Sequence, residues 1–300
     1  MEASATTPGD PLLSGGGNLR RRHRMNRIVT IASTMAALIA VAILALVIAS
    51  VVVKGASAIS WSFLTNSGAG QVFGTVGAGI ANSIVGTGIL IGLAAVMAVP
   101  VGLLVAIYTS EFAPPRVSYV VRFGLDLLVG VPTIVVGIFI FGLLIVSNGQ
   151  SALGGAIALA IIMLPIVART AQEVLELVPD TLKEAAYALG VARWRVVLRV
   201  VVPTAAGGLL TGSLIAVARV AGETAPLLFT CSLGTAIVST DISHAVPSIP
   251  VTIFVLSEQP YPAAHDQAWA AALVLIAFVL LLNIVARYFY GRSRRRLERA

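Results

Sequence analysis

The sequence predicts an all-α, polytopic membrane protein with six transmembrane helices and one polar cytoplasmic loop. First, 58% of the 300 residues are hydrophobic and only 11% are charged, whereas a soluble domain carries about 25% charged residues. Second, the apolar residues form unbroken runs of the length that a membrane-spanning helix needs, about 20 residues. Third, the basic residues gather in every second segment between the apolar runs, as expected for segments on one side of a membrane. A transmembrane barrel is excluded, because its strands would alternate apolar and polar residues over about ten positions.

The N-terminal region predicts a tail followed by a retained membrane helix. Residues 1–24 are rich in Gly, Ser, Thr and Pro and end in an arginine cluster, so we expect a disordered cytoplasmic tail there. The run 28–53 that follows holds no charge. It is longer than the apolar region of a signal peptide, which spans about 7–15 residues.

Six apolar segments are long enough to span the bilayer. Pro100, Pro132 and Pro165 fall inside spans, where neighbouring helices can satisfy the carbonyls that proline leaves free. Several spans contain glycine, and small residues let helices approach closely in lipid. The shorter apolar run 251–256 is expected as an interfacial helix or a plain connector. The six expected spans are 28–53, 82–109, 120–146, 151–169, 205–230 and 267–289.

The distribution of arginine and lysine predicts how the spans are oriented. With the N-terminus inside, every basic residue except Lys54 and Arg219 falls in a cytoplasmic segment, as the positive-inside rule requires. Both chain ends are therefore expected in the cytoplasm. The net charge of +7 reflects this orientation, and no nucleic-acid partner is expected.

The polar loop 180–203, between the fourth and fifth spans, is the most informative segment. Thr181 and Glu184 have the spacing of a capping box, which starts a helix. Gly190 stands where a left-handed residue would end that helix. A second short helix then runs back towards the membrane, so the sequence predicts a compact cytoplasmic knob.

A separate protein could grip this knob. Small apolar side chains on the first short helix would let a partner's groove close tightly around it. The alternative interpretation gives the same residues only local roles, as a capping carboxylate, a turn and interfacial arginines. The candidate contact residues are Glu184, Ala185, Ala186, Gly190, Arg193 and Pro203.

Charges inside a span are candidate solute contacts, because each costs about 2.5–3.5 kcal/mol at the bilayer centre. Arg219 lies about 24 Å along a helix from Pro203 and remains within hydrocarbon depth. Glu223 is four residues later, and the two are expected to pair. The pair is either a structural lock or an anion contact, in which the guanidinium fork binds phosphate and Glu223 competes for it.

Other polar positions near the spans are weaker candidates. Thr224 follows Glu223 and is grouped with it as a pathway residue. Arg169 lies at the cytoplasmic end of the fourth span, where snorkelling competes with a role at the inner mouth. Asp126 is expected to pair with Arg122 on its own helix.

Groups for catalysis or metal binding are sparse. Cys231 is the only cysteine, and the three histidines lack metal-ligand spacing. A P-loop needs a Gly-Lys pair, yet the only lysines, Lys54 and Lys183, follow Val53 and Leu182. We therefore expect no enzyme, no catalytic residue, and no metal or cofactor bound by this chain.

The loop resembles the EAA loop of ATP-binding-cassette importer permeases, E-A-A-x3-G-x9-hydrophobic-x-hydrophobic-P, over Glu184 to Pro203. The run from Arg219 to Pro226, R-x-x-G-E-T-A-P, is similar to the phosphate-importer permeases, on the PstA side of the PstA–PstC pair. The resemblance covers roughly residues 54–290. Three further segments carry it: Gly79–Thr87, Val131–Val135 and Leu164–Thr170.

The resemblance implies a type I importer permease fold over 25–300, in the inner membrane of a bacterium. It implies that the knob is a coupling helix, which docks into a cleft of an ATPase. The implied partners are a second, PstC-type permease, two PstB-type ATPase subunits that bind ATP and Mg²⁺, and an extracytoplasmic PstS-type phosphate-binding protein.

Two alternatives to phosphate import stay open. A permease for sulfate or molybdate would share the EAA loop, but by resemblance it would lack the Gly-Glu-Thr-Ala-Pro run. A stand-alone ion-coupled carrier would often show inverted repeats and binding groups at the bilayer midplane. The sequence shows no internal repeat, and one charge pair is a poor ion relay.

Overall fold

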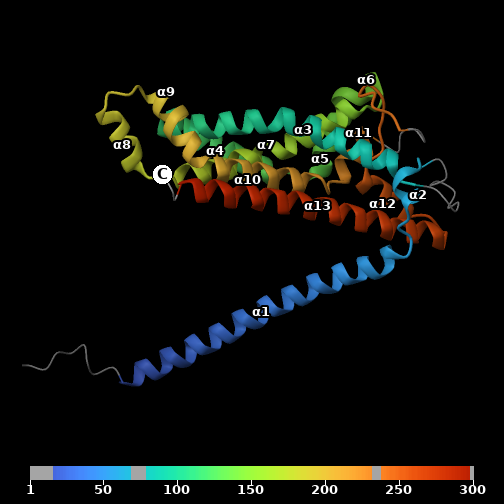
Figure 1. Ribbon diagram of the computed structural model, residues 1–300, viewed down its shortest axis with the longest axis horizontal. Helices are drawn as coiled ribbons and strands as arrows, with labels where there is room; N and C mark the ends of the chain where they lie inside the picture. The colour runs from blue at the N-terminus through green and yellow to red at the C-terminus, as the bar shows by residue number, and fades with distance from the viewer. Residues whose placement is uncertain (1–15, 69–78, 232–237, 298–300) are drawn as a thin grey trace, which may run out of the picture. The chain divides into compact units, whose positions relative to one another are not determined.

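The computed structural model describes residues 16–68, 79–231 and 238–297. Within these ranges every regular element is helical, so the predicted all-α class is confirmed (Figure 1). The chain divides into two units at Val52 and Val53. Helix α1 (Gly16–Ala56) provides the described part of the first unit, and the second unit holds the remaining helices.

The second unit begins at Val53, in the last turn of α1, and its first separate helix is α2 (Trp61–Thr65). The elements that follow, π-helical turns included, are α3 (Ala81–Ile107), η3 (Tyr108–Phe112), α4 (Pro115–Gly130), α5 (Thr133–Ile140), η4 (Phe141–Ile145), α6 (Val146–Asn148), α7 (Ala152–Glu176), α8 (Asp180–Ala188), α9 (Arg193–Val196), η5 (Val197–Val201), α10 (Val202–Val220), α11 (Ala225–Thr230), α12 (Ile249–Ser257) and α13 (Pro262–Leu297).

The predicted six spans have counterparts among the described residues. Five helices are long and apolar enough to cross a membrane, and the pair formed by α4 with α5–α6 makes a sixth span when taken as one. That pair is bent by 93° at Val131–Pro132, so the expectation of one continuous helix over 120–146 is wrong. Proline lacks the N–H that a helix needs, and it disfavours helical geometry at the residue before it.

The fifth span also differs from its expected bounds of 205–230. Its helix begins at Arg193, continues through η5 into α10 and ends at Val220. The chain then turns and restarts as α11, with Pro226 in the first turn. Proline is tolerated at that position because the N–H groups there have no helical partner. Glu223 therefore lies in the break and not on a helix face.

Three other segments extend or change the expected pattern. Helix α7 continues to Glu176, so Arg169 lies inside it rather than at its end. Residues 16–24 of the expected disordered tail belong to α1, and residues 1–15 lie outside the described part. The short helix expected at 251–256 is α12, but it packs against α3 and α13 and buries Val251 and Leu256.

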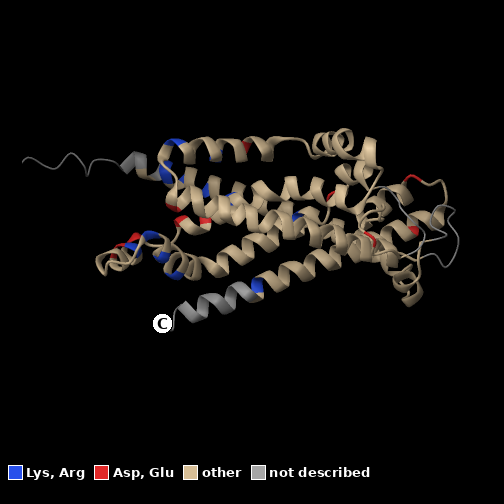
Figure 2. Cartoon of the chain, turned by 90° about the horizontal axis from the view of Figure 1, so that it is seen from above, with Lys and Arg blue, Asp and Glu red and all other residues tan. Residues whose placement is uncertain are grey.

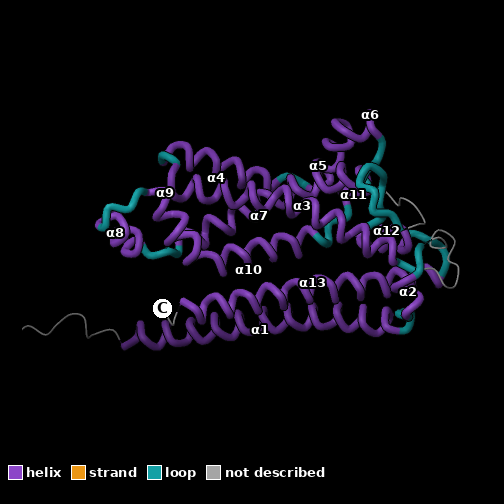
Figure 3. The backbone as a smooth tube through the Cα atoms, turned by 45° about the horizontal axis from the view of Figure 1, so that its top comes forward, coloured by secondary structure: helices purple, strands orange, loops and turns teal. Residues whose placement is uncertain are grey.

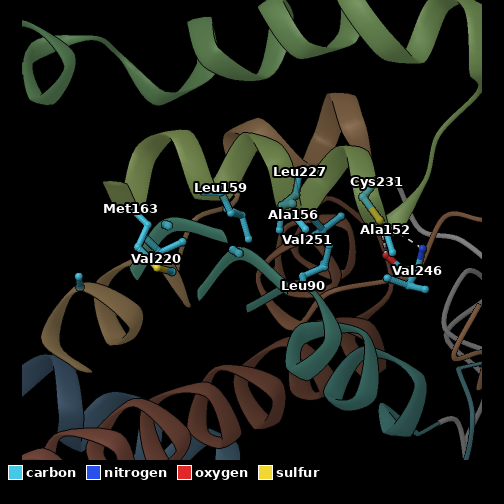
Figure 4. Close-up of a cluster of buried hydrophobic side chains, with 14 of the residues drawn as sticks. Leu90, Ala152, Ala156, Leu159, Met163, Val220, Leu227, Cys231, Val246 and Val251 are labelled. Atoms are coloured by element: carbon cyan, nitrogen blue, oxygen red, sulfur yellow. Dashed lines mark hydrogen bonds between the residues drawn. The ribbon is translucent and has the colours of Figure 1, made fainter. Parts of the chain in front are cut away.

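Helix α7 lies at the centre of the second unit and contacts α3, α4, α5, α10 and α11. Figure 3 shows α3, α4, α7 and α10 running alongside one another, with α8 and α9 at one end and α12 at the other. Leu159 and Met163 of α7 are almost fully buried against Leu90 of α3 and Val220 of α10 (Figure 4). The core thus fixes α7 and α10, which carry the two arginines discussed below.

Not every glycine in the spans serves close helix packing. A Cβ added at Gly86 in α3 would overlap the carbonyl oxygen of Pro247, in the connection before α12. A Cβ at Gly88, two residues further on, meets nothing within 4 Å. Of these two glycines, only Gly86 is needed for the close approach of α3 to Pro247.

We therefore expect Gly86→Ala to destabilise the protein by about 1–3 kcal/mol, the usual cost of overpacking. Gly88→Ala is the matched control, and it should be neutral or stabilising by up to about 1 kcal/mol, because alanine favours the helix. Thermal unfolding of the purified variants in one detergent measures both effects. Equal midpoints for the two variants would contradict the assigned contact.

Candidate functional site

The segment predicted as a knob folds into α8, the turn at Gly190 and α9. These residues, 180–196, are called the elbow from here on. Figure 1 places it at one end of the second unit, and Figure 2 shows acidic and basic residues gathered at that end. Helix α8 begins at Asp180, directly after Pro179, and no side chain caps it. The predicted capping box is wrong, because Thr181 and Glu184 both lie inside the helix.

Gly190 ends α8 as the sequence predicts. Its φ is +74°, the left-handed conformation in which glycine is favoured. The N–H of Gly190 donates to the carbonyl of Tyr187 at 2.9 Å, and the N–H of Val191 donates to that of Ala186 at 3.3 Å. These two bonds form a Schellman motif, which fixes the direction in which the chain leaves α8.

The elbow exposes both charge and apolar surface. Glu184 and Ala185 are exposed, Ala186 is half-buried, and Leu189 is 83% exposed. Trp194 on α9 is 54% exposed. Within the described residues the Glu184 carboxylate has no hydrogen-bonding or ionic partner. The elbow therefore carries a free carboxylate beside large apolar side chains, a combination suited to a protein partner.

The elbow is joined to the bundle through η3. Lys183 Nζ lies 2.8 Å from Glu111 Oε1 and 3.4 Å from Asp180 Oδ1. Burial alone lowers the pKa of Lys183, but bonding and charge from Glu111 and Asp180 outweigh it, so its pKa is raised. The Arg193 guanidinium stacks 5.6 Å from the ring centre of Phe112. Pro203 is exposed in the first turn of α10.

A cavity of about 370 Å³ lies between α4, α5, α7 and α10. Its polar side chains are Asp126, Thr133, Arg169, Thr170 and Arg219, and the rest of its wall is apolar. Thr133 is the first residue of α5, whose first turn has no capping side chain. Guanidinium groups and helix N-termini are groups that bind anions in proteins, and here they surround one space.

Arg169 and Asp126 form an ion pair in this cavity, with Nε and Oδ1 at 2.8 Å. The local pairing of Asp126 with Arg122 that we expected is wrong, because Arg122 binds Glu176 of α7 at 2.5 Å. Both carboxyl–guanidinium pairs join α4 to α7 across the helix interface. Arg169 thus lines the cavity and is paired there with Asp126.

Arg219 lines the same cavity from the last turn of α10. In the described part of the chain its guanidinium forms no ion pair with Glu223, so the predicted pair is wrong. The turn after α10, closed by the bond from Glu223 N–H to Val220 carbonyl, removes Glu223 from the helix face. Neither Glu223 nor Thr224 lines the cavity.

Sequence reasoning missed several residues of these sites. Thr133 and Thr170 stand inside two of the matched segments, but nothing in their spacing marks them as cavity residues. Glu111 follows the second span, where a charge is ordinary. Among the described residues, no three His, Cys, Asp or Glu side chains form a group that could hold a metal ion.

The described residues thus form an apolar multi-pass bundle with a charged cavity and an exposed polar elbow, features compatible with a membrane transport component. Residues 98–299 match the model of the family described as "Binding-protein-dependent transport system inner membrane component". The chain belongs to this family. It is accordingly a multi-pass membrane protein that works with ATPase and binding-protein partners.

Individual relatives carry names that are more specific than the family description. The phosphate transport system permease protein PstA of Yersinia pestis is 39% identical over 275 residues, 91% of this chain and 92% of its own length. PstA 1 of Mycobacterium tuberculosis is 42% identical over 224 residues, 73% of this chain and 72% of its own. These relatives are named as transport permeases, not as enzymes.

A solved structure supports the fold independently. A chain of the MetNI methionine ABC transporter, in an inward-facing conformation, superposes with a TM-score of 0.57. The two chains share 17% identity, and the match covers 71% of this chain and 94% of the other. At that identity the likeness bears on the fold alone, and it confirms the predicted importer permease fold.

Proposed function

We propose that this chain is the PstA-type permease subunit of an ATP-driven importer of inorganic phosphate. The observation that carries the proposal is the cavity into which Arg169 and Arg219 project beside the first turn of α5. Guanidinium groups bind phosphate through a planar fork of donors. The relatives named as phosphate transport permeases support the same anion.

The two arginines have different roles in this proposal. Arg219 has no carboxylate partner among the described residues, so an entering phosphate meets a guanidinium ready to donate. Arg169 is already paired with Asp126, and the carboxylate competes with the anion for it. This competition keeps binding weak enough for release, as transport through a pore requires. Asp126 thereby takes the part that the sequence assigned to Glu223.

The elbow is the proposed link to the energy source. Helix α8 docks, with Glu184 and the apolar side chains beside it, into a cleft of a PstB-type ATPase. Two such subunits bind ATP and Mg²⁺, and none of this chemistry is assigned to the permease. A second, PstC-type permease completes the translocation path, and a PstS-type binding protein delivers phosphate from outside.

The proposed location is the inner membrane of a bacterium, with the elbow and both chain ends in the cytoplasm. The support is the positive-inside distribution of arginine. In Figure 2 the basic residues of the second unit lie mostly towards the end that carries α8 and α9. Family membership does not favour the ion-coupled carrier, because members of this family work with a binding protein.

Purification of the complex from native membranes tests the proposal. We expect an ATPase to co-purify, and phosphate-loaded binding protein to stimulate ATP hydrolysis in the reconstituted complex. Sulfate and molybdate with their own binding proteins serve as comparisons. Stimulation by sulfate or molybdate and not by phosphate would mean that the other oxyanion is the transported substrate. Uptake driven by a proton or sodium gradient without the ATPase would overturn the function.

A further inference from the structure

An ion pair between the partly buried Lys183 and the buried Glu111 ties the elbow to the bundle. The side chains of Lys183 and Glu111 are 16% and 5% exposed, and their 2.8 Å contact is therefore shielded from water. A buried charge that loses its partner is strongly destabilising. Any movement of α8 that keeps this pair intact must carry η3 with it.

The π-helical turn η3 connects that pair to α7. Thr109, two residues before Glu111, is buried, and its hydroxyl accepts a hydrogen bond from Gln172 Nε2 at 2.7 Å. The Thr109 hydroxyl itself donates to the carbonyl of Val105 at 2.7 Å. Short π-helical turns are frequent at functional sites. Here the turn places Thr109 against α7 and Glu111 against α8.

Gln172 connects Thr109 of η3 to Arg169 at the cavity. It is 1% exposed, and its Oε1 accepts a hydrogen bond from Arg169 Nη1 at 3.3 Å. Arg169 Nε binds Asp126 at 2.8 Å. The guanidinium that faces the cavity is thus held by Gln172 on one side and Asp126 on the other. A shift of η3 therefore changes how Arg169 is held.

We propose that these side chains form a mechanical relay from the elbow to the cavity, in which Glu111 and Gln172 are positioning residues. ATPase movement displaces α8, Lys183 carries η3 with it, and Gln172 re-aims the Arg169 guanidinium towards or away from the anion. The relay consists of Lys183, Glu111, Thr109, Gln172, Arg169 and Asp126. The inference rests on the proposed function, because it needs α8 to dock on an ATPase.

A contiguous chain of contacts is not by itself evidence of coupling, so the test is a double-mutant cycle in the reconstituted importer. The readout is phosphate taken up per ATP hydrolysed, measured together with ATPase co-purification. We expect Glu111→Gln and Gln172→Leu each to lower this ratio about tenfold, within the usual range for coupled sites, with the ATPase still bound. The double variant should fall no further than either single variant.

Asp180→Asn is the matched control, because it removes the exposed partner of Lys183 and leaves Glu111 in place; its ratio should equal the wild type. Thr109→Val, which keeps the side-chain shape, replaces Gln172→Leu if that variant fails to assemble. Unchanged ratios in the single variants would overturn the relay, and so would losses that multiply in the double variant. A wild-type complex without phosphate-stimulated ATP hydrolysis would instead refute the proposed function.

Discussion

Replacing Arg219 with alanine should lower phosphate uptake by the assembled importer about 10- to 100-fold. A hydrogen bond to a charged group contributes about 1.5–3 kcal/mol, and about 1.4 kcal/mol corresponds to a factor of ten. Arg219 is expected to give this full effect because it lines the cavity without an intramolecular ion pair in the described residues. Uptake of labelled phosphate into proteoliposomes measures the loss.

Two variants separate the role of Arg219 in binding the anion from a loss of general stability. Arg219→Lys keeps the charge but not the planar fork, and it should recover part of the uptake. Arg287→Ala removes an exposed arginine on α13 that lies outside the cavity, and uptake should stay within about twofold, as expected for surface substitutions of at most about 0.5 kcal/mol. ATPase co-purification should be unchanged in all three. Normal uptake by Arg219→Ala would mean that the cavity arginine does not contact phosphate.

The parts of this molecule that the sequence could predict depend on local chemistry. Span lengths follow from bilayer thickness, so six spans could be expected from the lengths of the apolar runs. The turn at Gly190 could be expected because glycine is the residue that tolerates the left-handed conformation at a helix end. The elbow was visible as one polar segment between two apolar ones.

The breaks in the spans were missed because hydropathy does not distinguish a continuous helix from two bent pieces. Val131–Pro132 and the turn before Pro226 are short interruptions inside segments that are apolar enough overall to span the membrane. Proline inside a membrane helix is often tolerated, so Pro132 by itself does not predict a break. In the structure the first break borders the cavity, because Val131 lines it. The second break carries Glu223 away from the cavity.

The ion pairs were missed for a different reason. A sequence shows partners three or four residues apart on one helix, and it therefore predicts that Asp126 pairs with Arg122 and Arg219 with Glu223. The observed pairs join residues far apart in the chain, such as Asp126 with Arg169 and Glu111 with Lys183. Such pairs depend on helix packing, which only the tertiary structure supplies.

Gly190→Val should disconnect ATP hydrolysis from transport while the protein stays in the membrane. Gly190 has a φ of +74°, and valine is β-branched and rarely adopts that conformation. A Cβ at this position meets nothing within 4 Å, so the cost is backbone strain, about 1–3 kcal/mol. The elbow can relieve that strain by breaking the Schellman bonds and redirecting α9, which would misplace Glu184 and Leu189 relative to a docked ATPase.

Gly190→Asn is the matched control, because asparagine is the non-glycine residue best suited to this conformation. It should retain most of the ATPase binding and uptake that Gly190→Val loses. Both variants add a side chain to the same open surface, so a difference between them isolates the turn geometry from simple bulk. Equal losses in both would indicate instead that the partner contacts Gly190 directly. Normal transport by the valine variant would mean that α8 need not be held at this angle for docking.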